Sequence, residues 1–173
     1  MDFEHTQFLL KLLRDLPLIT PGSFTLAFGE KSNFYVDVKK AYGRPEFLSC
    51  ISDLFISLMD KRTTCVAGQG YGGIPLATAV SLRTGHPLTL VRERAKNHGR
   101  LGMIEGYIPN SEDKISVFDD VFTKGLSLQK TVRELENSGA EVLGCYVVVQ
   151  REKHLFPKPL NFLYTLDDLI VEP

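Results

Sequence analysis

The sequence carries almost no net charge, because 20 Lys and Arg residues oppose 21 Asp and Glu residues over 173 positions, giving a formal charge of -1. No overall field therefore attracts the chain to nucleic acid or to an anionic membrane, and we expect neither as a partner. A polyanionic ligand must instead meet a local cluster of basic side chains.

Cysteine is also scarce, and Cys50, Cys65 and Cys145 form no CxxC pair and lie near no His at metal-ligand spacing. This pattern predicts reduced thiols in the core rather than a zinc site or a disulfide framework. No apolar run approaches the ~20 residues needed to cross a bilayer. We therefore expect neither secretion nor membrane insertion, and a cytoplasmic location.

Internal repeats, low-complexity tracts and linker-like stretches are absent as well. With 43% hydrophobic and 24% charged residues, the chain has the composition of one globular domain. We expect this single domain to span residues 1–173.

Residues 1–44 are predicted to form a small N-terminal helix and hairpin. Leucines recur at helical spacing between residues 2 and 16, and Pro17 ends this amphipathic helix. Extended runs at 23–28 and 33–38 flank a short glycine-containing turn, which suits a hairpin at the edge of a sheet.

Pro45 opens a second predicted helix, and from residue 64 short apolar runs alternate with helical stretches. This alternation is typical of an α/β fold in which helices flank a parallel sheet. Residues 93–113 lack an apolar period and contain three glycines, so we expect a mobile functional loop there. The predicted strands are 64–67, 87–92, 114–118 and 141–149. The predicted helices between them are 74–83 and 127–138.

Residues 68–73 match GxGxxG between a predicted strand and a predicted helix. Its glycines let backbone N–H groups approach a phosphate or a diphosphate. Glu93, at the end of the next strand, would complete a dinucleotide fingerprint, although such a unit normally begins its domain. A dinucleotide site, a diphosphate loop and a tight turn without a ligand all stay open on this motif alone.

The most informative stretch begins with Asp119 and Asp120, directly after a buried strand. Two adjacent carboxylates repel one another and are costly to bury, so something polar must occupy the crevice that they face. The turn that follows offers the hydroxyls of Thr123 and Ser127, Gly125, and free N–H groups at a helix start, which together suit a phosphate. A ribose 5-phosphate would satisfy both halves.

This stretch resembles the phosphoribosyl-diphosphate motif of type I phosphoribosyltransferases. Lys124 and Leu126 depart from the motif, since small residues are usual at both positions. The resemblance implies a type I phosphoribosyltransferase-like parallel sheet flanked by helices, with the small N-terminal helix and hairpin as a hood. The matching residues are Asp119, Asp120, Thr123, Gly125 and Ser127.

Residues 91–99 hold three basic side chains and a histidine before a glycine. This second stretch resembles the catalytic loop of orotate phosphoribosyltransferases, except that Glu93 replaces a common Lys. The hairpin residues 29–35, the loop 68–75 and Arg151 also resemble parts of that family, although Gly72 replaces a common Lys. The matching loop residues are Arg92, Lys96, His98 and Gly99.

The resemblance implies transfer of ribose 5-phosphate from phosphoribosyl diphosphate to orotate, giving orotidine 5′-monophosphate and diphosphate in pyrimidine nucleotide synthesis. The implied catalytic residues are Arg92, Lys96 and His98. The implied contacts of phosphoribosyl diphosphate are Lys31, Tyr71, Gly73, Arg92, Lys96, His98, Asp119, Asp120, Thr123, Lys124, Gly125 and Ser127. The implied contacts of orotate are Phe34, Tyr35, Thr123 and Arg151.

Mg²⁺ is expected to bind mainly through the oxygens of phosphoribosyl diphosphate and water, so we assign no protein ligand to the metal. The resemblance further implies a homodimer in which the mobile catalytic loop 93–106 is shared across the interface. No feature of the sequence demonstrates that dimer by itself.

Two alternatives remain from the residues. One keeps the fold and the donor site but changes the acceptor to a purine base, or removes catalysis and leaves a regulator that binds phosphoribosyl diphosphate. The other is a dinucleotide-binding protein, which leaves the acid pair and the basic loop without a role. Arg151 discriminates against a purine acceptor, because purines have no carboxylate for its guanidinium to meet.

Overall fold

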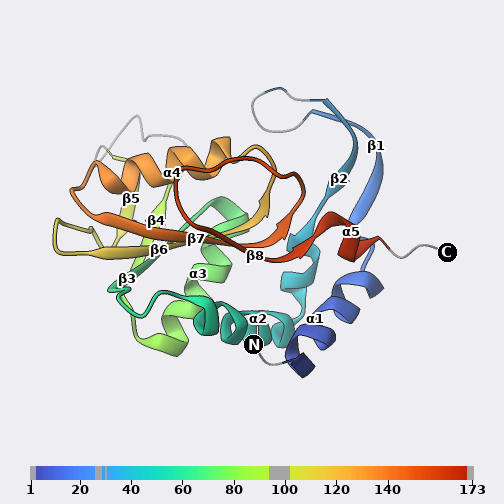
Figure 1. The fold of residues 1–173 in the computed structure, drawn as a ribbon, viewed down its shortest axis with the longest axis horizontal. Coiled ribbons are helices and arrows are strands. Elements are labelled where there is room, and N and C mark those ends of the chain that lie inside the picture. The colour runs from blue at the N-terminus through green and yellow to red at the C-terminus, as the bar shows by residue number, and fades with distance from the viewer. Residues whose placement is uncertain (1–2, 26–28, 30, 94–101, 171–173) are drawn as a thin grey trace.

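The computed structural model describes residues 3–25, 29, 31–93 and 102–170. Its centre is a six-stranded sheet in the order β5-β4-β3-β6-β7-β8 (Figure 1). Neighbouring strands pair in parallel except β4 and β5, which are antiparallel. The predicted α/β class is therefore confirmed. The strands of this sheet are β3 (Cys65–Gln69), β4 (Leu88–Val91), β5 (Ile104–Gly106), β6 (Lys114–Phe122), β7 (Glu141–Gln150) and β8 (Leu160–Thr165).

Helices cover both faces of the sheet, because successive side chains of each buried strand point to opposite sides. On β3, Val66 belongs to the core shared with α1, α2 and α3, whereas Cys65 and Ala67 belong to the core beneath α4. Figure 1 shows α4 on the opposite side of the sheet from α2 and α3. The helices are α1 (Phe3–Asp15), α2 (Pro45–Leu58), α3 (Gly70–Thr84), α4 (Leu126–Glu136) and the short α5 (Leu166–Leu169).

The order of the chain reverses between β3 and β6, which are neighbours at the centre of the sheet. From β3 the chain crosses through α3 to β4, and from β6 it crosses through α4 to β7 on the other side. A sheet of this kind opens a crevice at the carboxyl ends of the two strands where the order reverses.

The N-terminal hairpin differs from the sequence expectation. Among the described residues, β1 (Ile19–Thr25) and β2 (Lys31–Val36) pair with each other in a separate two-stranded sheet instead of joining the edge of the central one. Pro21 has no N–H to donate, and the register shifts between Pro21 and Phe24, so β1 is unsuited to pair on its outer side. The 3-10 helix η2 (Val38–Gly43) then connects the hairpin to α2.

Three further differences concern α3, β6 and β5. The helix α3 begins at Gly70 rather than at residue 74, because the glycines that predict a turn form its first turn. β6 continues to Phe122 rather than ending at 118, because the long β7 pairs with it as far as Gln150. β5 lies inside the stretch expected to lack regular structure, since three residues are too few to show an apolar period. Among the described residues, no helix is both long and apolar enough to span a membrane.

Candidate active site

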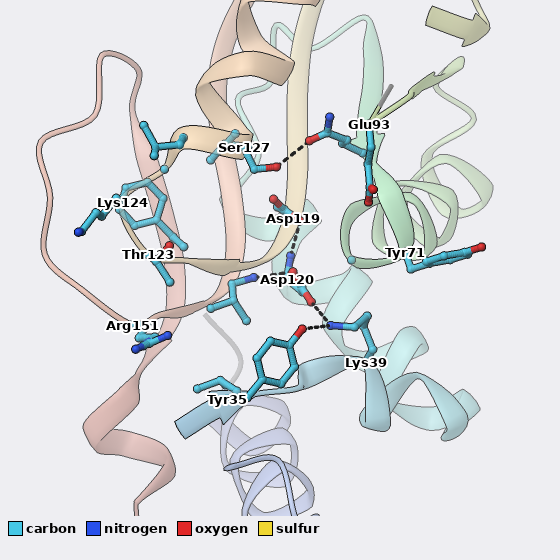
Figure 2. Close-up of a pocket in the computed structure, with 18 of the residues that line it drawn as sticks. Tyr35, Lys39, Tyr71, Glu93, Asp119, Asp120, Thr123, Lys124, Ser127 and Arg151 are labelled. Atoms are coloured by element: carbon cyan, nitrogen blue, oxygen red, sulfur yellow. Dashed lines mark hydrogen bonds and ion pairs between the residues drawn. The ribbon is translucent and has the colours of Figure 1, made fainter. Parts of the chain in front are cut away.

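A cavity of about 440 Å³ opens at the carboxyl ends of β3 and β6 (Figure 2). Thr25 of the hairpin lines it too, so the hood stands over the crevice. The cavity thus collects residues from β2, from the end of β3 and the first turn of α3, from β6 with its following turn, and from the position after β7. The predicted site residues that line it are Tyr35, Tyr71, Asp119, Asp120, Thr123, Lys124, Gly125, Ser127 and Arg151.

The acid pair lies within β6 and faces the first turn of α3. A Cβ on Gly72 would lie 2.5 Å from Asp120 Oδ1 and 3.0 Å from Asp119 Oδ1, so glycine leaves room for both carboxylates. Burial raises the pKa of Asp119 well above its usual value, and the charge of Asp120 raises it further. A ligand that donates hydrogen bonds, such as a pair of ribose hydroxyls, would relieve both effects.

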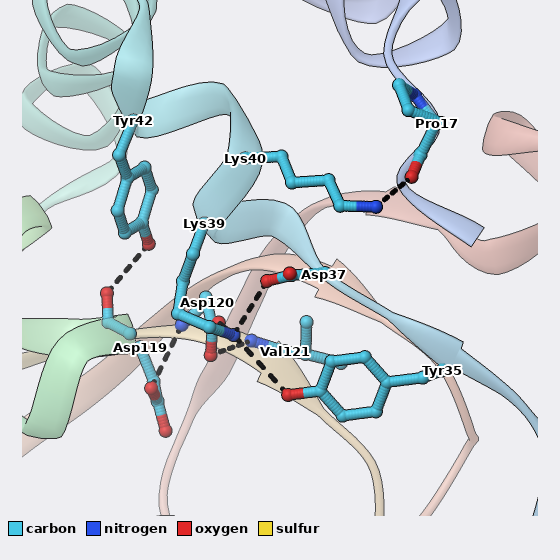
Figure 3. Close-up of polar contacts among 10 residues, drawn as sticks. Pro17, Tyr35, Asp37, Lys39, Lys40, Tyr42, Asp119, Asp120 and Val121 are labelled. Carbon is cyan, nitrogen blue, oxygen red and sulfur yellow. Dashed lines mark hydrogen bonds and ion pairs between the residues drawn. The ribbon is translucent and has the colours of Figure 1, made fainter. Parts of the chain in front are cut away.

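The helix η2 approaches the acid pair from the hood (Figure 3). Lys39 Nζ lies 3.2 Å from Asp120 Oδ2, and Tyr42 donates its hydroxyl to Gly72 O at 2.7 Å. Burial lowers the pKa of Lys39, but nearby carboxylates outweigh burial, so the net pKa is raised. η2 therefore contacts both the carboxylates and the glycine loop that faces them.

Residues 123–127 form the turn between β6 and α4. Gly125 precedes the helix with a φ of 73°, in the left-handed region that favours glycine, and no side chain caps the amino end of α4. The first N–H groups of an α-helix have no partner within the helix. This turn is therefore suited to bind a phosphate, and the exposed Lys124 adds a cation to it.

Gln69, the last residue of β3, joins three parts of the cavity wall. Its Oε1 accepts hydrogen bonds from Ser127 Oγ at 2.8 Å and from Thr131 Oγ1 at 2.9 Å. Its Nε2 donates to Arg92 O at 3.2 Å. Because Gln69 is buried, these bonds hold the end of β3, the start of α4 and the residue after β4 in one arrangement.

Arg151 follows β7 and is held from two sides. Its Nη2 donates to Ser32 Oγ at 2.8 Å, and its guanidinium carbon lies 4.4 Å from the centre of the Phe34 ring. Both partners belong to β2, so the hood orients an arginine of the sheet. A guanidinium has five N–H donors, and those that remain suit a carboxylate.

Two residues predicted to contact phosphoribosyl diphosphate bind other protein side chains instead. Lys31 Nζ donates to Thr25 Oγ1 at 2.8 Å across the hairpin, and Arg92 Nη2 pairs with Glu105 Oε1 at 2.8 Å. Neither Lys31 nor Arg92 lines the cavity among the described residues. The predicted residues that lie outside the described part of the chain are Lys96 and His98.

Comparison with known proteins identifies the family. Residues 44–163 match the phosphoribosyl transferase domain. The chain is 38% identical over 143 residues to the orotate phosphoribosyltransferase of Methanocaldococcus jannaschii. The aligned region covers 83% of this chain and 81% of that protein. The chain belongs to the phosphoribosyl transferase family.

Solved structures of phosphoribosyl transferases share the fold. The crystal structure of Mycobacterium tuberculosis orotate phosphoribosyltransferase in complex with Fe(III) dicitrate matches with a TM-score of 0.79 and 28% identity, over 96% of this chain and 99% of that one. The orotate phosphoribosyltransferase of Aeropyrum pernix matches with a TM-score of 0.78 and 29% identity, over 93% and 95% of the two chains.

Residues 68–73, the GxGxxG motif, span the end of β3 and the first turn of α3. The packing explains two of its glycines. A Cβ on Gly68 would overlap the carbonyl of Gly73, and a Cβ on Gly73 would overlap the carbonyl of Phe118 on β6. The first turn of α3 therefore packs directly onto the strand that carries the acid pair.

Sequence reasoning missed three residues of this phosphoribosyl transferase site, namely Lys39, Tyr42 and Gln69. Lys39 and Lys40 are adjacent, and no local pattern tells which of them turns inward. Gln69 gave a usable signal, since it is a polar residue at the end of an apolar strand, directly before a glycine loop.

Proposed function

We propose that this protein is an orotate phosphoribosyltransferase, which transfers ribose 5-phosphate from phosphoribosyl diphosphate to orotate and releases diphosphate. One observation carries the proposal: a single cavity brings together the acid pair, the phosphate turn and Arg151. The relatives that bear this name at up to 38% identity over most of the chain support it.

The donor would lie along β6. Asp119 and Asp120 would accept hydrogen bonds from the ribose hydroxyls, and the turn 123–127 would bind the 5-phosphate through the N–H groups of α4, Thr123 and Ser127. The diphosphate would extend toward Tyr71 and the other residues of the glycine loop. Lys31, on the hairpin, would approach the donor from the hood.

The acceptor would lie beneath the hood. Arg151 would receive the carboxylate of orotate in a charge-assisted contact. Phe34 and Tyr35 would contact the ring, and Thr123 would lie where base and ribose meet. Orotate carries its reactive nitrogen in an anionic or nearly anionic form, so positioning contributes more than a strong base.

The chemistry is a substitution at C1 of the ribose with inversion. Bond breaking runs ahead of bond making, so positive charge develops on the ribose and negative charge on the departing diphosphate. Cations near the leaving group therefore lower the barrier. We assign this role to Arg92, Lys96 and His98.

Mg²⁺ fits this site as a companion of the donor. Among the described residues, no cluster of three or more His, Cys, Asp or Glu side chains is arranged to hold a metal ion. We propose that the diphosphate and water supply most of its ligands, as that hard cation prefers. When bound, Mg²⁺ supplies positive charge to the leaving group.

Three further parts of the proposal concern the assembly. We propose a homodimer, a loop between β4 and β5 that closes over the donor and is shared between the subunits, and a cytoplasmic location. Closure would exclude water, which competes with orotate for the donor. The three unpaired cysteines suit a reducing compartment.

The test of the function is the loss of orotate absorbance when the purified protein meets phosphoribosyl diphosphate and Mg²⁺. A decline that requires Mg²⁺ is the expected result. An absence of decline, with calorimetry still detecting the donor, would contradict the proposal and favour a purine acceptor or a regulator that binds the donor.

A further inference from the structure

Lys39 occupies a junction between the two halves of the cavity. Its Nζ lies 3.2 Å from Asp120 Oδ2 on β6 and 3.0 Å from Asp37 Oδ1 at the end of the hairpin. The same atom lies 3.5 Å from the hydroxyl of Tyr35 and 5.6 Å from the centre of its ring. One cation thus touches the acid pair and an aromatic side chain that lines the acceptor side (Figure 3).

The neighbouring Lys40 shows how specific this placement is. Lys40 is exposed and donates to Pro17 O at 2.5 Å, so it points away from Asp119 and Asp120, as Figure 3 shows. The side chain of Lys39 is 33% exposed and that of Asp120 only 14%. The Lys39 contact is therefore partly shielded from water, where an ion pair is worth more than on the open surface.

We propose that Lys39 is a positioning residue of the transfer reaction, which holds the Asp120 carboxylate in place as a hydrogen-bond acceptor for the ribose and fixes Tyr35 beside it. The inference rests on the proposed function and extends it, since neither the motif of the family nor the sequence pattern assigns a role to this lysine. Lys39 acts through Asp120 and Tyr35 and needs no contact with the reacting atoms.

The electrostatic reason lies in the crowding of the acid pair. The titratable groups around Asp119 are Asp120 beside it, Lys39 and Tyr42 on η2, and the buried Cys145 on β7. The positive charge of Lys39 opposes the rise in the pKa of Asp119 that burial and Asp120 cause. Without this charge the pair would take up a proton at higher pH and would lose an acceptor for the ribose hydroxyls.

The experiment compares Lys39→Met with the matched control Lys40→Met and with Lys39→Arg, which keeps the charge. We expect Lys39→Met to raise the KM for phosphoribosyl diphosphate about tenfold or more, as loss of a charge-assisted contact does. The acid limb of its kcat/KM profile should move to higher pH. Lys39→Arg should restore most of both properties, and Lys40→Met should match the wild type.

Two outcomes would overturn the inference. Equal behaviour of Lys39→Met and Lys40→Met would remove any special role for Lys39. A loss of activity in Lys39→Met with an unmoved acid limb, no rescue by Lys39→Arg and a lowered thermal midpoint would show a structural role instead.

Calorimetry separates this test from the test of the function. If neither wild type nor Lys40→Met consumes orotate, the proposed function fails, whereas binding of phosphoribosyl diphosphate still measures the effect of Lys39. Weaker donor binding by Lys39→Met, most marked at low pH, would then support its role at the acid pair. Donor binding equal to that of the wild type at every pH would contradict it.

Discussion

Arg151 is oriented by β2 before any acceptor arrives, because Ser32 and Phe34 hold its guanidinium. We predict that Arg151→Ala raises the KM for orotate about ten- to hundredfold, the size expected for losing a hydrogen bond to a charged group. The KM for phosphoribosyl diphosphate should change little. Steady-state kinetics with each substrate varied in turn measures both, with the exposed Lys153→Ala as control. Equal losses for the two substrates would reject the role.

Glu93 places a carboxylate in a cavity that is meant for a polyanion. It lines the cavity and lies against Gly70, where a Cβ would overlap its Oε1. We predict that Glu93→Gln tightens binding of phosphoribosyl diphosphate about two- to fivefold, since removal of one exposed like charge has a modest effect. Calorimetry beside the distant Glu112→Gln measures it. Weaker binding would show that Glu93 has a function of its own.

The raised pKa of Asp119 makes the stability of the free protein depend on pH. An unfolded Asp has a pKa of ~3.9, so above that pH the folded protein binds more protons than the unfolded chain. Stability must therefore fall as the pH rises from there through the folded pKa. We predict that Asp119→Asn flattens this fall. The variant should therefore be more stable than the wild type at about pH 8, and this gain in stability should be smaller at about pH 5.

Urea unfolding at both pH values tests this prediction, with Asp60→Asn as the contrast. Arg62 hydrogen-bonds to the Asp60 carboxylate and lowers its pKa to about 2. The contribution of Asp60 is therefore present above ~3.9 and is lost only below it. Its substitution should leave the slope between the two pH values unchanged. A wild-type stability that does not fall over this range would contradict the assignment to Asp119.

At the scale of single residues, the sequence singled out the acid pair, the turn 123–127 and Arg151, which line one cavity in the structure, because each of these stands out within a few positions. It could not locate Lys39 or Gln69 in the site. Their partners Asp120 and Ser127 lie 81 and 58 positions away, and only the fold brings such residues together.

Two adjacent glycines in the first turn of α3 have different neighbours, one in the backbone of β6 and the other in the acid pair. A Cβ on Gly73 would overlap the backbone carbonyl of Phe118, whereas a Cβ on Gly72 would meet the carboxylates of the acid pair. We predict that Gly73→Ala lowers the free energy of unfolding by about 1–3 kcal/mol, because a fixed backbone must move. Gly72→Ala should lose donor affinity with a smaller effect on stability.

Thermal unfolding and donor calorimetry on the two glycine variants distinguish these effects. The more distant Gly43→Ala is a suitable control, since a Cβ there meets nothing within 4 Å. Equal losses of stability in Gly72→Ala and Gly73→Ala would contradict the separation.

Among the elements, long periodic segments were predicted well and short or continued ones were not. The helices α1 and α4 and the strands β3, β4 and β7 lie within two residues of the predicted bounds. β5 is short, and η2 has no apolar period. The acid pair predicts an end to β6, but pairing with β7 continues the strand past both carboxylates. Tertiary pairing, rather than local preference, decides such elements.

For the whole molecule, the pattern of apolar runs fixes the layers, and the placement of the hood depends on contacts far apart in the chain. Tyr164 on β8 donates its hydroxyl to Thr6 O at 2.8 Å, and Arg14 Nε donates to Asp168 O at 2.9 Å. The helix α1 beneath the hairpin is thus held by the last strand and helix of the described chain. No sequence pattern reveals these contacts, which span more than 150 positions.

These same contacts set an order of events at the ribosome. The helix α1 is made long before β8 and α5, the elements that hold it, because the two contacts span 158 and 154 residues. Contacts of such separation form late, because the entropic cost of closing a long loop opposes them. The leucines of α1 therefore stay uncovered on that side until β8 and α5 have been synthesised, and a nascent chain in this condition is a natural client for a chaperone.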